Sequence, residues 1–269
     1  MIIFKSINNL KKKVNFSKNI GFVPTMGAIH EGHLSLINQS KKKCDKTIVS
    51  IFINPKQFNN KLDFKNYPRN LNKDIKLLKK IRVDYLLLPK YDELFRVNLK
   101  KKIRLKNKDR ILCAKYRPGH FEGVLHVINQ YLNLIQPKFI FLGEKDYQQY
   151  YLISNFIKDK FITKSYLCKT IRHNNLFALS SRNKLLNNKD LHILKSVSVI
   201  IKKFYSSIKK EKKNVKNLNL IKNLLERTGI NLEYLEIRNK INFSKKISKK
   251  NFKIFVAYYF KKIRFIDNF

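Results

Sequence analysis

The stretch of sequence that decides the fold runs from Ile20 to His33 and reads Ile-Gly-Phe-Val-Pro-Thr-Met-Gly-Ala-Ile-His-Glu-Gly-His. Its first four residues, Ile20–Val23, form an apolar run that is typical of a short strand. The residues after it, Leu34–Lys43, have the pattern of a helix. A strand, a glycine-bearing turn and a helix start predict a phosphate site, because they offer unpaired backbone N–H groups and the positive end of the helix dipole.

Two histidines lie at this helix start. His30 and His33 are three residues apart, so both imidazoles fall on one face of the first helical turn and can point at the same ligand. Their spacing does not match the HExxH motif of zinc proteases, and the chain contains neither a Walker A loop nor GxGxxG. The stretch therefore indicates a nucleotide enzyme.

Outward from this stretch, the first two-thirds of the chain alternate between strand-like and helix-like segments. We expect strands at 20–23, 47–53, 83–88, 139–142 and 165–171. We expect helices at 32–43, 70–81, 123–135 and 147–158. This alternation predicts an α/β fold, a Rossmann-like doubly wound parallel sheet covered on both faces. Ligands bind such sheets at the carboxyl ends of the strands.

The pattern changes after about Asn183. We expect helices at 185–208 and 220–227, a polar linker at 209–219, and antiparallel strands at 232–237, 240–243 and 252–259. These segments indicate a second, smaller α+β domain. We therefore divide the chain into residues 1–178, a Rossmann-like nucleotide-binding domain, and residues 179–269, a smaller C-terminal domain expected to act as a lid.

The composition is extremely basic, with 59 Lys and Arg against 18 Asp and Glu and a formal net charge of +41. Because the lysines are dispersed in short runs, we interpret them as solvated surface and expect no nucleic-acid partner. No apolar run reaches the ~18 residues of a membrane span, and Met1–Phe4 is too short for a secretory signal. The three cysteines, an odd number without a CxxC pair, favour a reducing cytosol.

Polar clusters follow three of the predicted strands, at Asn54–Phe58, Gly143–Asp146 and Leu179–Asn183. Glycine lets backbone approach a phosphate, and lysine, arginine and serine side chains suit phosphate oxygens. Asp146 suits a ribose hydroxyl or a water-bridged Mg²⁺. Each cluster, like the glycine-containing loop Arg117–Gly123, is also compatible with a capped surface turn, so that only their combination indicates a site.

These residues carry a family resemblance. His30–His33 resembles the signature of the HIGH-motif nucleotidyltransferases, which include the class I aminoacyl-tRNA synthetases, and Ser180–Arg182 looks like their companion phosphate loop. The resemblance is closer to one family, the pantoate–β-alanine ligases (pantothenate synthetases). Its motifs occur in order along essentially the whole chain, at 24–27, 50–58, 67–69, 117–121, 136–137, 143–149, 179–183 and 264–268.

The resemblance implies a ligase of pantothenate and coenzyme A biosynthesis that forms an amide bond. In such an enzyme, ATP and (R)-pantoate give pantoyl-adenylate and pyrophosphate, and β-alanine then attacks the adenylate to give pantothenate and AMP. The resemblance also implies a cytoplasmic homodimer that uses Mg²⁺ with ATP and has no nucleic-acid or membrane partner.

The same resemblance assigns residues to the site. It implies that His33, His30, Lys145 and Arg182 carry the catalysis. It implies that Gln57 and Gln149 bind pantoate, with Gln57 also near β-alanine. The residues implied to bind ATP are Met26, Gly27, Ala28, Ile29, His30, Glu31, Gly32, His33, Gly143, Glu144, Lys145, Asp146, Ile171, Leu179, Ser180, Ser181 and Arg182. No metal ligand is assigned, and Asp74 is a candidate Mg²⁺ contact.

The chain departs from the family pattern at three places. Asn175-Leu176 stands where the family usually has Asp-Gly, Glu122 stands where an arginine is common, and 112–116 replaces a Leu-x-Gly-Ala-Ser stretch. Two alternatives stay open at this point, another HIGH-motif nucleotidyltransferase and a basic RNA-binding protein. The pair Gln57 and Gln149 favours a small hydroxy acid as substrate over a nucleotide chain.

Overall fold

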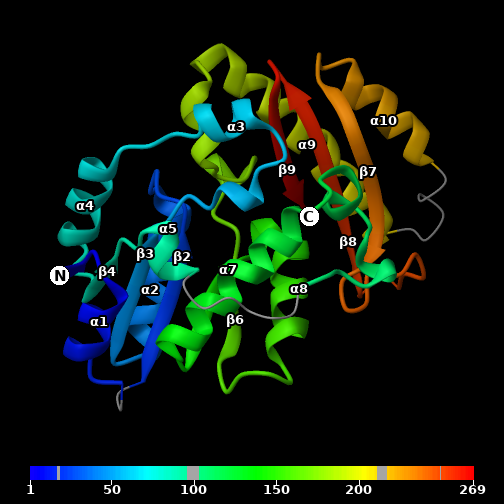
Figure 1. The fold of residues 1–269 in the computed structure, drawn as a ribbon. Coiled ribbons are helices and arrows are strands. Elements are labelled where there is room, and N and C mark those ends of the chain that lie inside the picture. The colour runs from blue at the N-terminus through cyan, green and yellow to red at the C-terminus, as the bar shows by residue number, and fades with distance from the viewer. Residues whose placement is uncertain (17–18, 96–102, 211–216, 249) are drawn as a thin grey trace. The chain divides into compact units, whose positions relative to one another are not determined.

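The computed structural model describes residues 1–16, 19–95, 103–210, 217–248 and 250–269. The chain divides into two compact units, Met1–Thr170 and Ile171–Phe269 (Figure 1). This division precedes the boundary expected after residue 178, because Arg172 and the backbone N–H of Ala178 both donate hydrogen bonds to Asp267 in the C-terminal unit. Residues 211–216 of the predicted linker 209–219 lie outside the described residues.

The N-terminal unit contains a six-stranded, all-parallel sheet with the order β1-β4-β3-β2-β5-β6. The strands are β1 (Ile2–Phe4), β2 (Ile20–Thr25), β3 (Lys46–Ile51), β4 (Tyr85–Leu87), β5 (Phe139–Gly143) and β6 (Lys164–Cys168). The five predicted strands correspond to β2–β6, and only the short edge strand β1 was not expected. The prediction of a doubly wound α/β fold is confirmed.

The helices of this unit are α1 (Ile7–Lys13), α2 (Glu31–Lys43), α3 (Lys61–Asn66), α4 (Leu71–Lys80), α5 (Tyr91–Leu94), α6 (Cys113–Tyr116), α7 (His120–Ile135) and α8 (Tyr147–Ile157). They cover both faces of the sheet. Successive residues of a strand point to opposite faces, so neighbouring residues of β2 contact different helices. Val23 of β2 packs in the same core cluster as Ile37 of α2 and Leu78 of α4. Its neighbour Phe22 contacts Tyr131 of α7, with ring centroids 4.9 Å apart.

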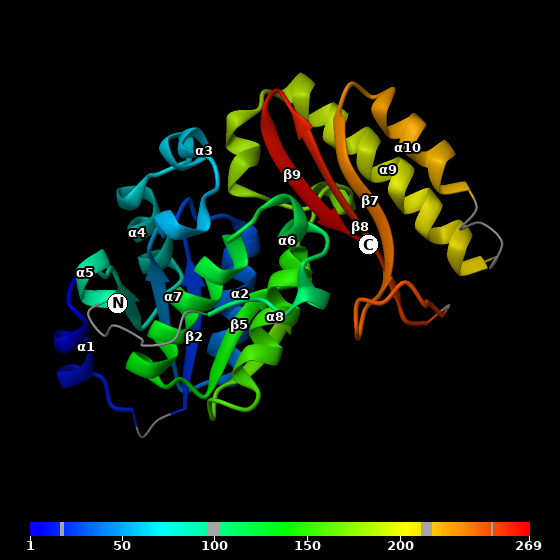
Figure 2. The same cartoon turned by 45° about the vertical axis from the view of Figure 1, so that its right-hand side comes forward.

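The C-terminal unit is the smaller α+β domain that the sequence predicts. Its helices are α9 (Asn188–Lys210) and α10 (Leu218–Glu226), and its antiparallel strands are β7 (Asn231–Asn239), β8 (Phe252–Phe260) and β9 (Ile263–Asn268). Both helices lie against the three-stranded sheet (Figure 2). The shared core includes Val197 and Ile201 of α9, Leu225 of α10, and Ile254 and Val256 of β8.

One predicted strand of this unit is wrong. Lys240–Phe243 forms a turn after β7, and the third strand is instead β9. The side chain of Asn239 accepts a hydrogen bond from the backbone N–H of Ile241, and Phe243 has a positive φ of 59°. Asparagine side chains that bind nearby backbone compete in this way with strand formation.

None of the described helices combines the length and the apolar character needed to cross a membrane.

Candidate functional site

The predicted site lies at the carboxyl edge of three adjacent strands, β3, β2 and β5. The chain leaves β2 toward β3 on one side, while β5 and β6 extend the sheet on the other side. Such a reversal of strand order opens a crevice at the carboxyl ends of an open α/β sheet. The segments that follow these three strands contain Gln57, the pair His30 and His33, and Gly143–Asp146.

The structure brings His30 and His33 together at the start of α2. Their ring centroids are 4.1 Å apart, which confirms that the two imidazoles share one face of the first helical turn. His30 is the N-cap residue, and its Nδ1 accepts a hydrogen bond of 3.1 Å from the backbone N–H of Gly32. An accepting Nδ1 carries no proton, so this contact makes His30 a neutral imidazole with its proton on Nε2.

Gly32 is required for this arrangement. A Cβ at residue 32 would lie 2.8 Å from Cε1 and 3.0 Å from Nδ1 of His30, so any larger residue would displace the imidazole. The exposed Glu31 lies between the two histidines in sequence. The order His-Glu-Gly-His therefore places two imidazoles at the helix start, and its glycine leaves room for His30 to cap the helix.

The expectation of unpaired backbone N–H groups in this loop is wrong for several residues. The N–H of Gly27 donates to Oγ1 of Thr25 at 3.2 Å, and the N–H of His33 donates to the carbonyl of His30 at 2.8 Å. The N–H groups of Ala28 and Ile29 donate to Asp74, both at 2.8 Å. Polar neighbours satisfy these donors because buried backbone groups rarely stay unpaired. These four backbone donors are therefore engaged within the protein.

The carboxylate of Asp74 stabilises residues 26–30, which we call the histidine loop. Asp74 lies on α4, its side chain is only 2% exposed, and its two carboxylate oxygens each accept one backbone hydrogen bond from the loop. Gly27 and Ala28 have positive φ values of 78° and 51°, so the loop passes through the left-handed region, which is unfavourable for Ala28. The carboxylate thus stabilises a turn that the local sequence does not favour.

We expect Asp74→Asn to destabilise the protein by about 1–3 kcal/mol, because an amide NH₂ group would face a buried backbone N–H and leave it without an acceptor. The free energy of unfolding measured in urea provides the test. Asp159→Asn, at an exposed carboxylate, is the matched control and should stay within about 0.5 kcal/mol of the wild type. Equal stability of the two variants would contradict this role for Asp74.

The segment after β5 supplies a partly buried cation. Nζ of Lys145 lies 3.2 Å from Oδ1 of Asp146, with side chains that are 20% and 43% exposed. Gly143 ends β5, and apart from Gly143 itself and its two chain neighbours, no described residue has an atom within 4 Å of the position that a Cβ would take there. Gln149 lies in the first turn of α8 and is partly exposed, whereas the neighbouring Gln148 is buried and donates to the carbonyl of Ile111 at 2.7 Å.

Gln57 closes a short 3₁₀ helix, Pro55–Gln57, that follows β3. Asn54 caps this helix, with its Oδ1 accepting from the backbone N–H of Lys56 at 3.2 Å. Its Nδ2 donates to the carbonyl of Gly123 in α7, also at 3.2 Å. Gln57 itself is 9% exposed, so most of its side chain is surrounded by protein.

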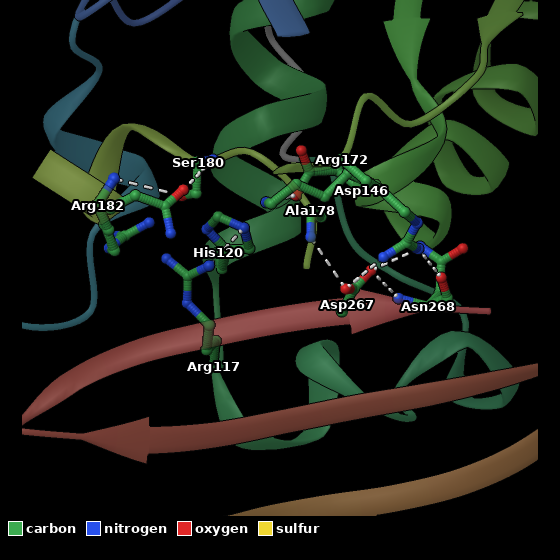
Figure 3. A network of polar contacts seen from close by, with 11 residues as sticks. Arg117, His120, Asp146, Arg172, Ala178, Ser180, Arg182, Asp267 and Asn268 are labelled. Atoms are coloured by element: carbon green, nitrogen blue, oxygen red, sulfur yellow. Dashed lines mark hydrogen bonds and ion pairs between the residues drawn. The ribbon is translucent and has the colours of Figure 1, made fainter. Parts of the chain in front are cut away.

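The remaining predicted residues, Ile171 and Leu179–Arg182, belong to the C-terminal unit, where the structure brings them together with one another. The backbone N–H of Leu179 donates to the carbonyl of Ile171 at 3.0 Å. Ser180 caps a 3₁₀ helix, Ser181–Leu185, and its Oγ accepts from the N–H of Arg182 at 3.3 Å (Figure 3). These contacts shape the loop locally.

Neighbouring residues accommodate two of the three departures from the family pattern, those at Asn175-Leu176 and at Glu122. Asn174 takes a left-handed conformation, with φ 45° and ψ 42°, directly before the Asn175-Leu176 pair. Asparagine tolerates this region better than most residues, and the turn still closes with an Arg172–Ala178 bridge. Glu122 forms an ion pair of 3.2 Å with Arg110.

The buried thiols of Cys44 and Cys168 are core groups rather than nucleophiles. Burial raises the pKa of both, that of Cys168 to about 12, so that both stay protonated near neutral pH. Among the described residues, no three His, Cys, Asp or Glu side chains are grouped so that they could hold a metal ion.

The contribution of Asp74 to the loop was not predicted, although the sequence contains a signal for it. Asp74 falls on the same helical face as Leu71, Ile75 and Leu78, so a carboxylate interrupts an apolar stripe. An acidic residue on a buried face requires a partner. The sequence does not show which backbone groups provide that partner.

Comparisons with known proteins agree over the full chain. The family model described as pantoate-beta-alanine ligase matches residues 2–269. A pantothenate synthetase of Francisella tularensis subsp. mediasiatica is 39% identical over 270 residues, covering 98% of this chain and 94% of the relative. One of Francisella philomiragia is 39% identical over 277 residues, covering 100% of this chain and 97% of the relative.

Solved structures give the same result. The pantoate-β-alanine ligase of Francisella tularensis in complex with β-γ ATP and β-alanine is 38% identical, with a TM-score of 0.85, covering 100% of this chain and 97% of that one. The pantothenate synthetase of Thermus thermophilus is 27% identical, with a TM-score of 0.92, covering 100% of this chain and 99% of that one.

Proposed function

The chain belongs to the pantoate–β-alanine ligase family and is therefore a ligase that joins pantoate to β-alanine, and we propose that its two units carry out this reaction through a pantoyl-adenylate. The other nucleotidyltransferase and the RNA-binding protein considered from the sequence are not supported by these comparisons. The observation that supports the proposed chemistry best is the pair His30 and His33 at the start of α2, with Lys145 following the adjacent strand β5.

The first step needs positioning and charge neutralisation rather than a base. The carboxylate of pantoate, with a pKa near ~4, is already an anion at neutral pH. One of its oxygens forms a bond to the α-phosphorus of ATP while the bond from that phosphorus to the bridging oxygen breaks, and the electron pair leaves with pyrophosphate. The protein has to hold the two reactants in line and stabilise the charge on phosphorus.

We propose that His30, His33 and Lys145 provide this stabilisation from the N-terminal unit. A neutral His30 with its proton on Nε2 is a hydrogen-bond donor for a phosphate oxygen, and the adjacent ring of His33 reaches the same region. Lys145 adds a full positive charge on the segment after β5. Fixed donors of this kind act most strongly where charge develops in the transition state.

In the second step, we propose that the free amine of β-alanine attacks the carbonyl carbon of the adenylate. The new C–N bond forms, the bond from the acyl carbon to the phosphate oxygen breaks, and AMP leaves with the electron pair. The amine loses a proton to solvent or phosphate. The same phosphate contacts then stabilise the leaving AMP, so one set of residues serves both steps.

We propose that Gln57 and Gln149 bind the hydroxyl and carboxylate oxygens of pantoate. The positions of the two glutamines support this role, because Gln57 ends the turn after β3 and Gln149 lies in the first turn of α8, which follows β5. Amide side chains both donate and accept hydrogen bonds, as a hydroxy acid requires. Gln57 is also proposed to contact β-alanine.

Mg²⁺ is proposed to enter with ATP, because the described residues contain no grouped set of protein ligands and Mg²⁺ commonly binds substrate phosphates plus one or two carboxylates. Asp146 fits this chemistry, since its carboxylate is 43% exposed. Asp74 would have to give up a hydrogen bond to the histidine loop, so we propose Asp146 in preference. When bound, Mg²⁺ would neutralise phosphate charge.

We further propose that Ile171, Leu179, Ser180, Ser181 and Arg182 also bind ATP, and that residues 179–269 act as a lid. A lid would protect the adenylate from hydrolysis. A homodimeric, cytoplasmic enzyme is proposed from the family, and the buried thiols of Cys44 and Cys168 are compatible with a reducing compartment.

The proposed function is tested by incubating the protein with ATP, Mg²⁺, (R)-pantoate and β-alanine and measuring AMP and pantothenate. We expect equal amounts of the two products. Without β-alanine, we expect pantoate-dependent exchange of labelled pyrophosphate into ATP, which reports the adenylate alone. Formation of pantothenate without this exchange would contradict the adenylate, and a folded protein that forms neither product would contradict the function.

A further inference from the structure

The loop Arg117–Gly123 has no role in the mechanism above, although it is one of the motifs singled out in the sequence. We propose that Arg117 and His120 act as a clamp that positions Gln57 for pantoate, and that they do so through the backbone of Gln57. This inference rests on the proposed binding of pantoate by Gln57. Arg117 and His120 are positioning residues in this scheme, since they act through Gln57 and need not contact the substrate.

Two side chains of this loop converge on one carbonyl. Nδ1 of His120 lies 2.6 Å from the carbonyl oxygen of Gln57, and Nη2 of Arg117 lies 3.1 Å from the same atom. Nη1 of Arg117 lies 3.0 Å from Nε2 of His120 (Figure 3). A carbonyl has two lone pairs, so these two donors satisfy it completely.

The contacts determine the protonation state of His120. A carbonyl oxygen only accepts, so Nδ1 must donate, and a guanidinium only donates, so Nε2 must accept. His120 is therefore a neutral imidazole with its proton on Nδ1. The Arg117 fork touches the imidazole and the carbonyl together, which a lysine ammonium on a flexible stem would not reproduce.

The backbone of the loop adapts to this geometry. Gly119 precedes α7 with a positive φ of 80°, the left-handed region that glycine enters without strain. This bend, together with a hydrogen bond of 3.1 Å from the N–H of His120 to the carbonyl of Arg117, brings both side chains to the same side. Asn59 also donates to the carbonyl of Pro118.

The turn that carries Gln57 is fixed from a second direction. A Cβ on Gly123 would lie 2.3 Å from the carbonyl oxygen of Lys56, so α7 directly abuts the backbone before Gln57. Asn54 adds its hydrogen bond to the carbonyl of Gly123. With its backbone held on both sides, Gln57 has a fixed Cα position and a restricted direction for its amide side chain, which lowers the cost of ordering it on binding pantoate.

The first arm of the experiment compares two substitutions of His120. The amide nitrogen of asparagine can replace Nδ1, whereas that of glutamine lies nearer to Nε2, so only His120→Asn keeps the donor to Gln57. We expect His120→Gln to raise the KM for pantoate about 10- to 100-fold, and His120→Asn to raise it much less. The KM for ATP should stay within about twofold for both, because a clamp on Gln57 does not act on the nucleotide.

The second arm is a double-mutant cycle with Gln57→Ala. If His120 acts through Gln57, then His120→Gln should add nothing to the effect of Gln57→Ala on kcat/KM for pantoate. If the factors by which the two single substitutions lower kcat/KM instead multiply in the double variant, the clamp is overturned. Arg117→Lys, which keeps the charge and loses the fork, provides the same cycle if His120→Gln does not fold, as judged by thermal unfolding. His192→Asn, at an exposed histidine on α9, is the matched control and should match the wild type.

The outcomes separate the clamp from the proposed function. If Gln57→Ala leaves the pantoate KM unchanged, then the assignment of Gln57 to pantoate fails. If Gln57→Ala raises it while His120→Gln and Arg117→Lys do not, the assignment stands and the clamp is overturned. Equal rises in the KM values for pantoate and ATP would also overturn it, because they would indicate a general structural defect.

Discussion

Replacing His33 with alanine is expected to slow formation of the pantoyl-adenylate about 100- to 1,000-fold, the usual cost of removing one fixed donor to a transition-state anion. The physical reason is its position at the start of α2, where its ring lies 4.1 Å from that of His30, centroid to centroid, and both face the same region. The measurement is the rate of pantoate-dependent exchange of pyrophosphate into ATP at saturating substrates.

The matched control for this prediction is His192→Ala, which removes an exposed imidazole from α9 and should leave the exchange rate unchanged. We expect the loss in His33→Ala to fall mainly on kcat, because the histidine is proposed to act on charge that develops in the transition state. An exchange rate equal to that of the wild type would remove His33 from the mechanism. A loss confined to the KM for ATP would assign it to nucleotide binding instead.

Replacing Arg172 with methionine is expected to destabilise the protein by about 3–5 kcal/mol, because it leaves the buried carboxylate of Asp267 without its cation. Nη1 and Nη2 of Arg172 lie 2.8 and 3.0 Å from the two carboxylate oxygens, and the Asp267 side chain is 7% exposed (Figure 3). The guanidinium also donates to the carbonyls of Leu176 and Asn268 and lies over the ring of Phe269.

The free energy of unfolding in urea tests this prediction, with Arg227→Met at an exposed position on the same unit as the matched control. The double variant Arg172→Met with Asp267→Leu should lose less stability than Arg172→Met alone, because it removes the buried charge together with its partner. If the single variant were as stable as the control, the ion pair would not stabilise the C-terminal unit.

Much of the fold was predictable because it depends on local periodicity. The apolar run at Ile20–Val23 and the helical pattern at Gly32–Lys43 correspond to β2 and α2, and alternation of such segments leads to a parallel sheet. The prediction failed at Lys240–Phe243, where the apolar and polar residues alternate as in a strand. There, Asn239 binds the backbone two residues on, and a side-chain hydrogen bond outweighed the pattern.

The pairing of His30 and His33 was also predictable, since residues three apart share one face of any helix. The contacts by which Asp74 and His120 support the site were not predictable from the sequence. Asp74 binds backbone groups that lie 46 and 45 residues before it in sequence, and His120 binds the carbonyl of a residue 63 positions away. No local pattern records which distant backbone atom a buried polar side chain will satisfy.

The sequence by itself therefore determined the class of fold, the order of most elements and the residues at the carboxyl edge of the sheet. Only the tertiary structure decided how the opening stretch Ile20–His33 is held. It showed that Asp74 occupies N–H groups that the sequence left for a ligand, and that His30 caps its own helix through Nδ1. The reason is physical: periodicity is set by neighbours along the chain, whereas the partner of a buried polar group is set by packing.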